Sequence, residues 1–176
     1  RRKVAERLIR LASQRQVIVF THDIVFLMDL IKLSENQNIP LQQSYLRTCL
    51  NHSGECLDGL PRAAMKVSSR IERLKQRYQE ADTVLRREGQ EAYESEARSI
   101  YGLLRETWER AVEEVLLNGV VIRFDRAIHT QQLRNLTDIS DDDLRVINDA
   151  MTKCSRFLEG HDESIAVVEP VPSSDE

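Results

Sequence analysis

The sequence predicts a mostly helical α/β protein. Long stretches carry apolar residues at alternating spacings of three and four, which is typical of helices that pack through one face. Of the 176 residues, 31% are charged and only 5% aromatic, a composition that favours a helix-rich protein over a β-sandwich. One short apolar run, Val17 to Phe20, instead predicts a strand that is covered on both faces.

Composition also bounds the partners and the compartment. A formal net charge of −4 argues against nucleic-acid binding by the whole surface. A local basic strip that binds nucleic acid remains possible. No run approaches the length that spans a bilayer, and nothing resembles a secretory signal, so we expect a soluble, cytoplasmic protein without membrane partners. Three cysteines are too few for a disulfide scaffold and fit a reducing compartment.

Residues 1–31 predict a helix, a buried strand and a second helix, with His22 at the junction. Apolar residues line one face of 1–12, the strand covers 17–20, and Thr21 or Asp23 is placed to cap the helix that follows. A histidine at the carboxyl end of a buried strand, beside a helix N-terminus, lies where open α/β sheets bind ligands. His22 is therefore the strongest functional candidate, although most histidines at strand ends only hydrogen-bond backbone or water.

The surrounding pattern resembles a known family. The order RRKVAERLIRLA, QVIVF, Thr-His-Asp and a second apolar helix is similar to the last αβα unit of ABC-type P-loop ATPases, in the SMC-like and RecF-like branch. The stretch VAERLIRLASQRQVIVFTHDIVFLMDL especially resembles bacterial ATPases related to anticodon-nuclease and anti-phage defence systems. The resemblance covers Arg1 to about Ile31, is fainter beyond, and returns near Arg123 and at KCSRF and GHD. It implies that His22 is the switch histidine, whose imidazole contacts the ATP γ-phosphate across a dimer interface.

The resemblance also implies partners that this chain does not supply. The sequence opens with Arg-Arg-Lys inside an apparent helix, so we expect a fragment or split product of a longer protein. It lacks the phosphate-binding motif G-x-x-x-x-G-K-[ST], a strand ending in paired carboxylates, and the family's nucleotide-signature segment. We therefore expect ATP and Mg²⁺ to be bound mainly by an upstream ATPase half, heads to form a homodimer, and the isolated chain not to hydrolyse ATP.

The rest of residues 1–60, taken as the C-terminal βα lobe of an ATPase head, predicts a loop, a strand and a second loop. Residues 34–40 end in proline, 41–50 alternate weakly as a more exposed final strand would, and NHSGECLDGLP contains two glycines and a proline. Cys49, His52 and Cys56 have a spacing that suits three zinc ligands. A second cysteine pair is lacking, so we favour a buried strand position for Cys49 instead.

Residues 61–118 predict an antiparallel coiled-coil hairpin. Two heptad seams of similar length are separated by Gly89, and each helix needs the apolar stripe of the other. The first seam is Val67, Ile71, Leu74, Tyr78, Ala81 and Leu85; the second is Tyr93, Ala97, Tyr101, Leu104, Trp108, Ala111 and Val115. Glutamates alternate with a basic cluster, so we expect a solvated, ion-paired face rather than a nucleic-acid track. That cluster is Arg70, Arg73, Lys75, Arg77, Arg86 and Arg87.

Residues 119–160 predict a C-terminal helical segment, and 161–176 an acidic tail that is extended or disordered. Ser140 and Asp143 form a capping box. An apolar stripe follows it and Gly160 ends the helix; the stripe is Leu144, Ile147, Met151, Cys154 and Leu158. The tail contains two prolines and would be disordered alone or lie in a groove of a partner. His161 and Asp162 are a candidate functional pair, for which a structural or solvated role is favoured.

Two other functions compete with an ATPase that couples ATP-driven dimerisation to an effector protein. One is a structural or interaction module in which His22 is a core residue. The other is a ribonuclease, because Arg123 and His129, separated by five residues, resemble the arginine–histidine motif of HEPN ribonucleases. Phe124 occupies a position where that motif usually has a polar residue, so we favour the ATPase.

Overall fold

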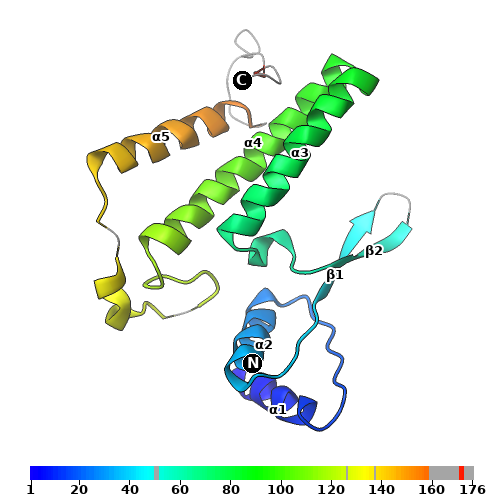
Figure 1. Cartoon of the computed structure of the whole chain (residues 1–176), viewed down its shortest axis with the longest axis vertical. Coiled ribbons are helices and arrows are strands. Elements are labelled where there is room, and N and C mark those ends of the chain that lie inside the picture. Colours follow the sequence, from blue (N-terminus) through cyan, green and yellow to red (C-terminus); the bar gives the residue numbers. More distant parts are fainter. Residues whose placement is uncertain (50–51, 126, 137, 159–170, 173–176) are drawn as a thin grey trace. The chain divides into compact units, whose positions relative to one another are not determined.

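The computed structural model describes residues 1–49, 52–125, 127–136, 138–158 and 171–172. These residues are mostly helical, with one two-stranded antiparallel sheet (Figure 1). The chain divides into two compact units, Arg1–Met65 with Phe124–Arg126 and Lys66–Arg123 with Ala127–Glu176. No helix within the described ranges has both the length and the apolar character needed to cross a lipid bilayer.

In the first unit, the two predicted helices form as α1 (Arg2–Ala12) and α2 (Ile24–Gln37) and pack against each other. α2 extends to Gln37, so the loop predicted over 34–40 is wrong for its first four residues. Their buried contact is formed by Ala5, Ile9 and Leu30. Partly buried apolar residues surround it, namely Leu8, Phe26, Leu33, Ile39 and Leu41. α2 ends at Asn38, whose left-handed backbone (φ 52°) provides the usual C-terminal stop of a helix.

The buried strand predicted for Val17 to Phe20 is wrong for this structure. The run is neither helix nor strand, and Ile18 and Phe20 are 71% and 88% exposed. A buried strand needs neighbouring strands to bond its backbone N–H and C=O groups, and no described segment pairs with this one. The apolar composition of the run suggested a strand, but the pairing that makes a strand is non-local.

The predicted strand over 41–50 is confirmed as β1 (Ser44–Cys49), but the loop predicted after it is wrong. That stretch forms β2 (His52–Asp58), which pairs antiparallel with β1 and places Ser44 opposite Asp58. Arg47 and Glu55 lie opposite each other and form an ion pair at 2.5 Å. Gly54 is tolerated inside β2, which explains why a glycine-based loop assignment failed. The sheet is thus a separate two-stranded hairpin rather than part of an α/β sheet.

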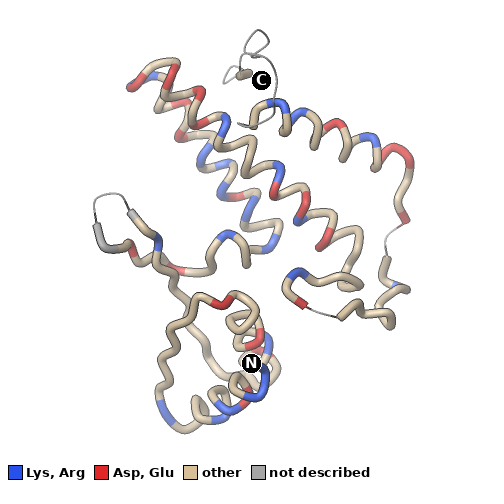
Figure 2. Tube along the Cα trace, turned by 180° about the vertical axis from the view of Figure 1, so that it is seen from behind, with Lys and Arg blue, Asp and Glu red and all other residues tan. Residues whose placement is uncertain are grey.

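The second unit contains the predicted helical hairpin. α3 (Val67–Glu88) and α4 (Gln90–Ala111) are joined by Gly89 alone, whose φ of 87° suits glycine. Contacts from α3 to Glu96 near the start of α4 and to Glu106 near its end show that the helices run antiparallel. Basic and acidic residues alternate along both helices, as Figure 2 shows. Arg86 pairs with Asp82 as expected for an exposed face.

The predicted seam on α3 is confirmed in part, because Leu74 and Ala81 are buried as predicted. The buried residues of α3 are Arg70, Leu74 and Ala81, whereas Ile71 and Tyr78 are 41% and 53% exposed. The heptad spacing did not include Arg70, because arginine is usually solvated. Arg70 breaks the expectation of a fully solvated basic face, because its Nη1 donates to the Glu106 carbonyl oxygen across the hairpin at 3.0 Å. α4 continues beyond Ala111 into a π-helical turn (Val112–Leu116). Val115, the last residue of the seam predicted for this helix, lies in that turn and is exposed.

The C-terminal helix α5 (Asp141–Arg156) begins with the predicted capping box and packs on α4. The Tyr101 and Phe157 ring centroids are 4.5 Å apart, and a Cβ on Gly102 would lie 3.2 Å from Leu158 Cδ2. Burial raises the pKa of the Cys154 thiol, which is 1% exposed. Leu144, at the start of the predicted stripe, is 48% exposed. A short 3₁₀ helix (Arg62–Ala64) precedes α3, and another (Thr130–Asn135) precedes α5.

Candidate functional site

His22 lies immediately before α2, in a turn held on both sides. The Thr21 hydroxyl oxygen accepts a hydrogen bond from the Asp23 N–H at 3.0 Å. Asp23 caps α2 through one carboxylate oxygen, which accepts from the Phe26 N–H at 3.2 Å, while its other oxygen pairs with Arg1 Nε at 2.8 Å. Of the two predicted candidates for the cap, Thr21 and Asp23, the structure shows Asp23 in this role, and the turn fixes the backbone that carries His22.

The His22 side chain is free to meet a ligand. It is exposed, and no hydrogen bond or ion pair ties it to another described residue. It stands beside the positive end of the α2 dipole, and the first turn of α2 contains no acidic residue. Arg1 offsets the charge of Asp23. This arrangement of an exposed imidazole, a helix N-terminus and a neutralised cap suits one contact with an anion such as a phosphate oxygen.

The sequence and the described residues lack the groups that usually complete a nucleotide-binding site. Its sequence has no phosphate-binding glycine loop with a lysine. Among the residues that are described, no group of three His, Cys, Asp or Glu side chains is arranged to hold a metal ion. His22 therefore suits a contact with an anion, and the described residues do not provide a phosphate cradle or Mg²⁺ ligands.

Arg123 is engaged by a buried carboxylate. Its Nε lies 3.2 Å from Glu113 Oε2, and its backbone N–H donates to Glu113 Oε1. Arg110 Nη1 also contacts Glu113 at 2.6 Å, so this carboxylate, 9% exposed, joins two guanidinium groups. Phe124 has a left-handed backbone (φ 73°) that turns the chain directly after Arg123, and the His129 N–H donates to the Val120 carbonyl oxygen at 2.8 Å. A nuclease would need the Arg123 charge for a scissile phosphate, and here Glu113 already takes it.

The zinc spacing falls on the β-hairpin. Cys49 on β1 lies opposite His52 on β2, and Cys56 is a free, exposed cysteine four positions further along β2. At about 3.3 Å per residue, the backbone positions of His52 and Cys56 are about 13 Å apart, too far for side chains to share a zinc ion at bonds of about 2 Å. The spacing of these three residues would suit a zinc site in a loop, but the extended strand β2 holds His52 and Cys56 apart.

Comparison with known proteins gives no relative. The chain matches no family model, no curated protein and no solved structure. The relationship to ABC-type ATPases thus remains a prediction from the residues around His22.

Two groups that sequence reasoning missed are in the second unit. Glu113 was not singled out from the sequence, and nothing in the local pattern signals that it is buried between two arginines. Tyr93 was assigned to seam packing, and its hydroxyl in fact binds the Pro172 carbonyl. The two prolines that flank Val171 were the available signal of a docking segment. The His161 and Asp162 pair lies outside the described residues.

Proposed function

We propose that this chain is the C-terminal portion of an ABC-type ATPase, in which His22 senses the γ-phosphate of ATP. The observation that carries the proposal is the segment that leads into His22. Residues 16–20 are without regular structure, their backbone makes no hydrogen bond to another described residue, and apolar side chains are exposed on it. An apolar run with its backbone unpaired on both edges suits a strand inserted between strands of another segment.

Completion of the sheet would also complete the site. α1 precedes the run in the sequence and α2 follows it, and the two helices already pack against each other. Asp23, directly after His22, caps α2. A strand added over residues 16–20 would put His22 at the carboxyl edge of that sheet, where α/β folds bind ligands. The rest of the ATPase would supply the phosphate loop and the Mg²⁺ ligands.

The helical arm is the proposed output. α3 and α4 are each 22 residues long, about 33 Å at 1.5 Å per residue, and Arg77 forms an ion pair with Glu96 between them. Such an arm suits a lever that carries the effect of ATP-driven head dimerisation to an effector protein. The similarity of residues 4–30 to defence ATPases favours a bacterial defence system in the cytoplasm as the setting.

The test replaces His22 in the complete polypeptide that carries this chain. His22→Ala should lower ATP turnover by about a hundredfold, the usual effect of removing one polar group that contacts the reacting phosphate. It should also weaken ATP-dependent dimerisation, measured by analytical ultracentrifugation with and without ATP. His22 is exposed and makes no internal contact among described residues, so the substitution should leave the melting temperature unchanged.

His129→Ala is the matched control, because it removes the other described histidine whose role was in question. We expect normal ATP turnover from it. If His22→Ala turns over ATP and dimerises as the unaltered protein does, the chain is an interaction module rather than part of a catalytic site. If His129→Ala abolishes an RNA-cleaving activity, the ribonuclease alternative returns.

A further inference from the structure

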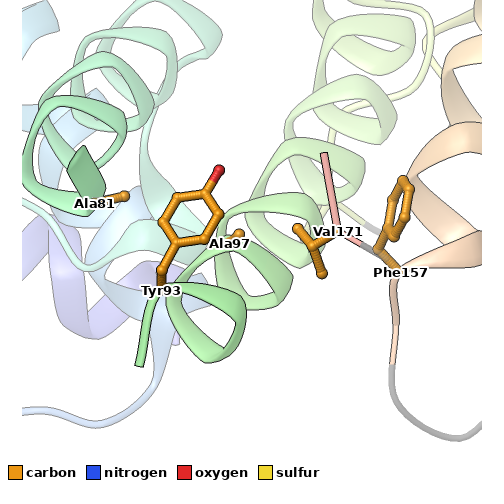
Figure 3. Packing of buried hydrophobic residues seen from close by; sticks show 5 residues of the cluster. All are labelled: Ala81, Tyr93, Ala97, Phe157 and Val171. Atoms are coloured by element: carbon orange, nitrogen blue, oxygen red, sulfur yellow. The ribbon is translucent and has the colours of Figure 1, made fainter. Parts of the chain in front are cut away.

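The helical hairpin holds a short piece of the chain's own C-terminal tail. Val171 is 7% exposed and belongs to the same apolar cluster as Ala81, Tyr93, Ala97 and Phe157, as Figure 3 shows. These residues come from α3, α4 and the end of α5. The partly buried residues around the cluster are Leu85, Ile100 and Tyr101.

The tail is held at a second, polar point. The Tyr93 hydroxyl donates a hydrogen bond of 2.8 Å to the Pro172 carbonyl oxygen. Tyr93 is itself 6% exposed, so its ring lies in the apolar cluster while its hydroxyl meets the peptide backbone. The site thus recognises an apolar side chain together with the carbonyl of the residue that follows it.

This pairing of contacts suits a particular class of peptide. Proline fixes its own φ near −65° and has no N–H to satisfy, so a proline-flanked segment loses little entropy when it docks against an aromatic surface. Val171 stands between Pro170 and Pro172 in the sequence EPVPSSDE, which also carries three acidic residues. A tyrosine that donates to the backbone beside an apolar pocket is a common way to hold such segments.

We propose that the Tyr93–Ala97 groove is a recognition site for an extended peptide with an apolar residue followed by proline, and that the tail occupies it in cis. The partner would be a protein that presents such a segment in an acidic context. Because a tethered ligand has an effective concentration on the order of millimolar, the tail blocks weak competitors and only a partner that displaces it gains the groove. The inference is independent of the ATPase proposal.

The test opens the groove in the full chain. Val171→Asp places a charge in the apolar cluster and should release the tail. A synthetic peptide with the sequence EPVPSSDE is then titrated into the ¹⁵N-labelled variant, and the amide signals of Tyr93 and Ala97 are followed. We expect saturable shifts of both signals, and binding of the same peptide to the unaltered chain that is about tenfold weaker because the tail competes.

Three controls distinguish specific recognition of the peptide from non-specific binding. A peptide with aspartate in place of its valine should not shift the signals. Adding Tyr93→Phe to the opened chain should weaken binding about fivefold, since the ring stays and only the hydroxyl donor is lost. Val146→Asp, which charges an exposed valine on α5 away from the groove, should behave as the unaltered chain does.

The proposal is overturned if the opened chain keeps a folded spectrum and does not bind the peptide, or if the unaltered chain binds it equally well. If Val171→Asp unfolds the hairpin, Val171→Ala takes its place. That change removes two methyl groups and should weaken binding of the tail to the groove about tenfold, so the affinity for the added peptide should rise. An unchanged peptide affinity would contradict the proposal. If the unaltered chain is a dimer that the peptide dissociates into monomers, the groove holds the tail of a second copy. That result would overturn occupancy in cis.

Discussion

Arg70 carries a charge into the interface between α3 and α4. It is 1% exposed, and its Nη1 donates to the Glu106 carbonyl oxygen at 3.0 Å. The hydrocarbon part of an arginine packs like an apolar side chain while its head satisfies polar groups. Both contributions are lost together when the side chain is truncated, because a cavity forms and a buried hydrogen bond disappears.

We therefore expect Arg70→Ala to lower the free energy of unfolding by about 3 kcal/mol, measured by urea denaturation. Lys75→Ala is the matched control, since it removes an exposed positive charge from the same helix. Its effect should stay within about 0.5 kcal/mol. Equal effects of the two variants would mean that Arg70 stabilises only through the net charge of α3.

Helix caps were predictable from the sequence, and buried charges were not. Asp23 and Ser140 were both expected to cap helices, and both do, because a cap depends on residues within one turn of it. The burial of Arg70 and Glu113 depends on residues of a second segment. Likewise, the sequence indicated the local turn around His22 but not the exposure of the run before it.

α5 owes its start to a reciprocal pair of hydrogen bonds. The Ser140 hydroxyl donates to Asp143 Oδ2 at 2.6 Å, and the Ser140 N–H donates to the same oxygen at 3.0 Å. The Asp143 N–H in turn donates to the Ser140 hydroxyl oxygen at 3.2 Å. The bonds from the Ser140 side chain and then from its backbone lower the pKa of Asp143 below the usual 3.8.

The start of α5 should accordingly lose stability in acid. A carboxyl group whose pKa is lowered by folding contributes its stability above the unfolded value of 3.8, and that contribution is lost as the pH falls through the lower folded value. Amide signals of Asp141 to Leu144, followed by NMR from about pH 6 to pH 2, should show fraying in that window. Ser140→Ala should fray at every pH, and Ser68→Ala, on the exposed face of α3, should retain the transition of the unaltered chain. An Asp143 titration at its usual pKa would contradict this account.

Residues 16–20 form the element whose state depends on what surrounds the chain. Their amides have no acceptor among the described residues, so hydrogen exchange of Val17, Ile18 and Val19 should be close to the unprotected rate in the isolated chain. In the complete ATPase, pairing within a sheet should slow the same amides by at least about a hundredfold. The amides of Ile9 and Leu30, in the α1–α2 core, serve as protected references in both samples. Exchange that is fast in both samples would contradict a strand at this place.

Periodic elements and paired elements differ in how far they follow from sequence. The hairpin helices were predicted because a helix bonds within itself and its apolar spacing is local. Strands need partners, so β1 was found but its pairing with β2 was missed, and the run at 17–20 was given a partner that the described chain does not hold.

At the scale of the whole molecule, the proposal divides labour between the two units. His22 lies in the first unit and the helical arm in the second, and the chain passes between the units after Met65, after Arg123 and after Arg126. Under this proposal, the arm would contribute reach and the first unit one catalytic contact, so neither unit by itself would account for ATP turnover.

The isolated chain should therefore release no phosphate from ATP above background, measured by a colorimetric phosphate assay with Mg²⁺ present. Its sequence contains neither the lysine-bearing phosphate loop nor a strand ending in paired carboxylates. A heat-denatured sample sets the background, and the complete polypeptide serves as the positive reference. Turnover by the isolated chain that His22→Ala abolishes would show that it contains a whole site of another kind.

Gly89, as the sole link between α3 and α4, has a consequence for how the arm changes length over evolution. Both 22-residue helices meet at Gly89, so a residue inserted into one helix would shift its pairings with the other helix on the side of the insertion away from Gly89. Arg77 would lose Glu96, and Arg70 would lose Glu106. Insertions and deletions should therefore survive only as matched additions to both helices in whole heptads, so homologues should differ in reach by fixed steps of about 10 Å.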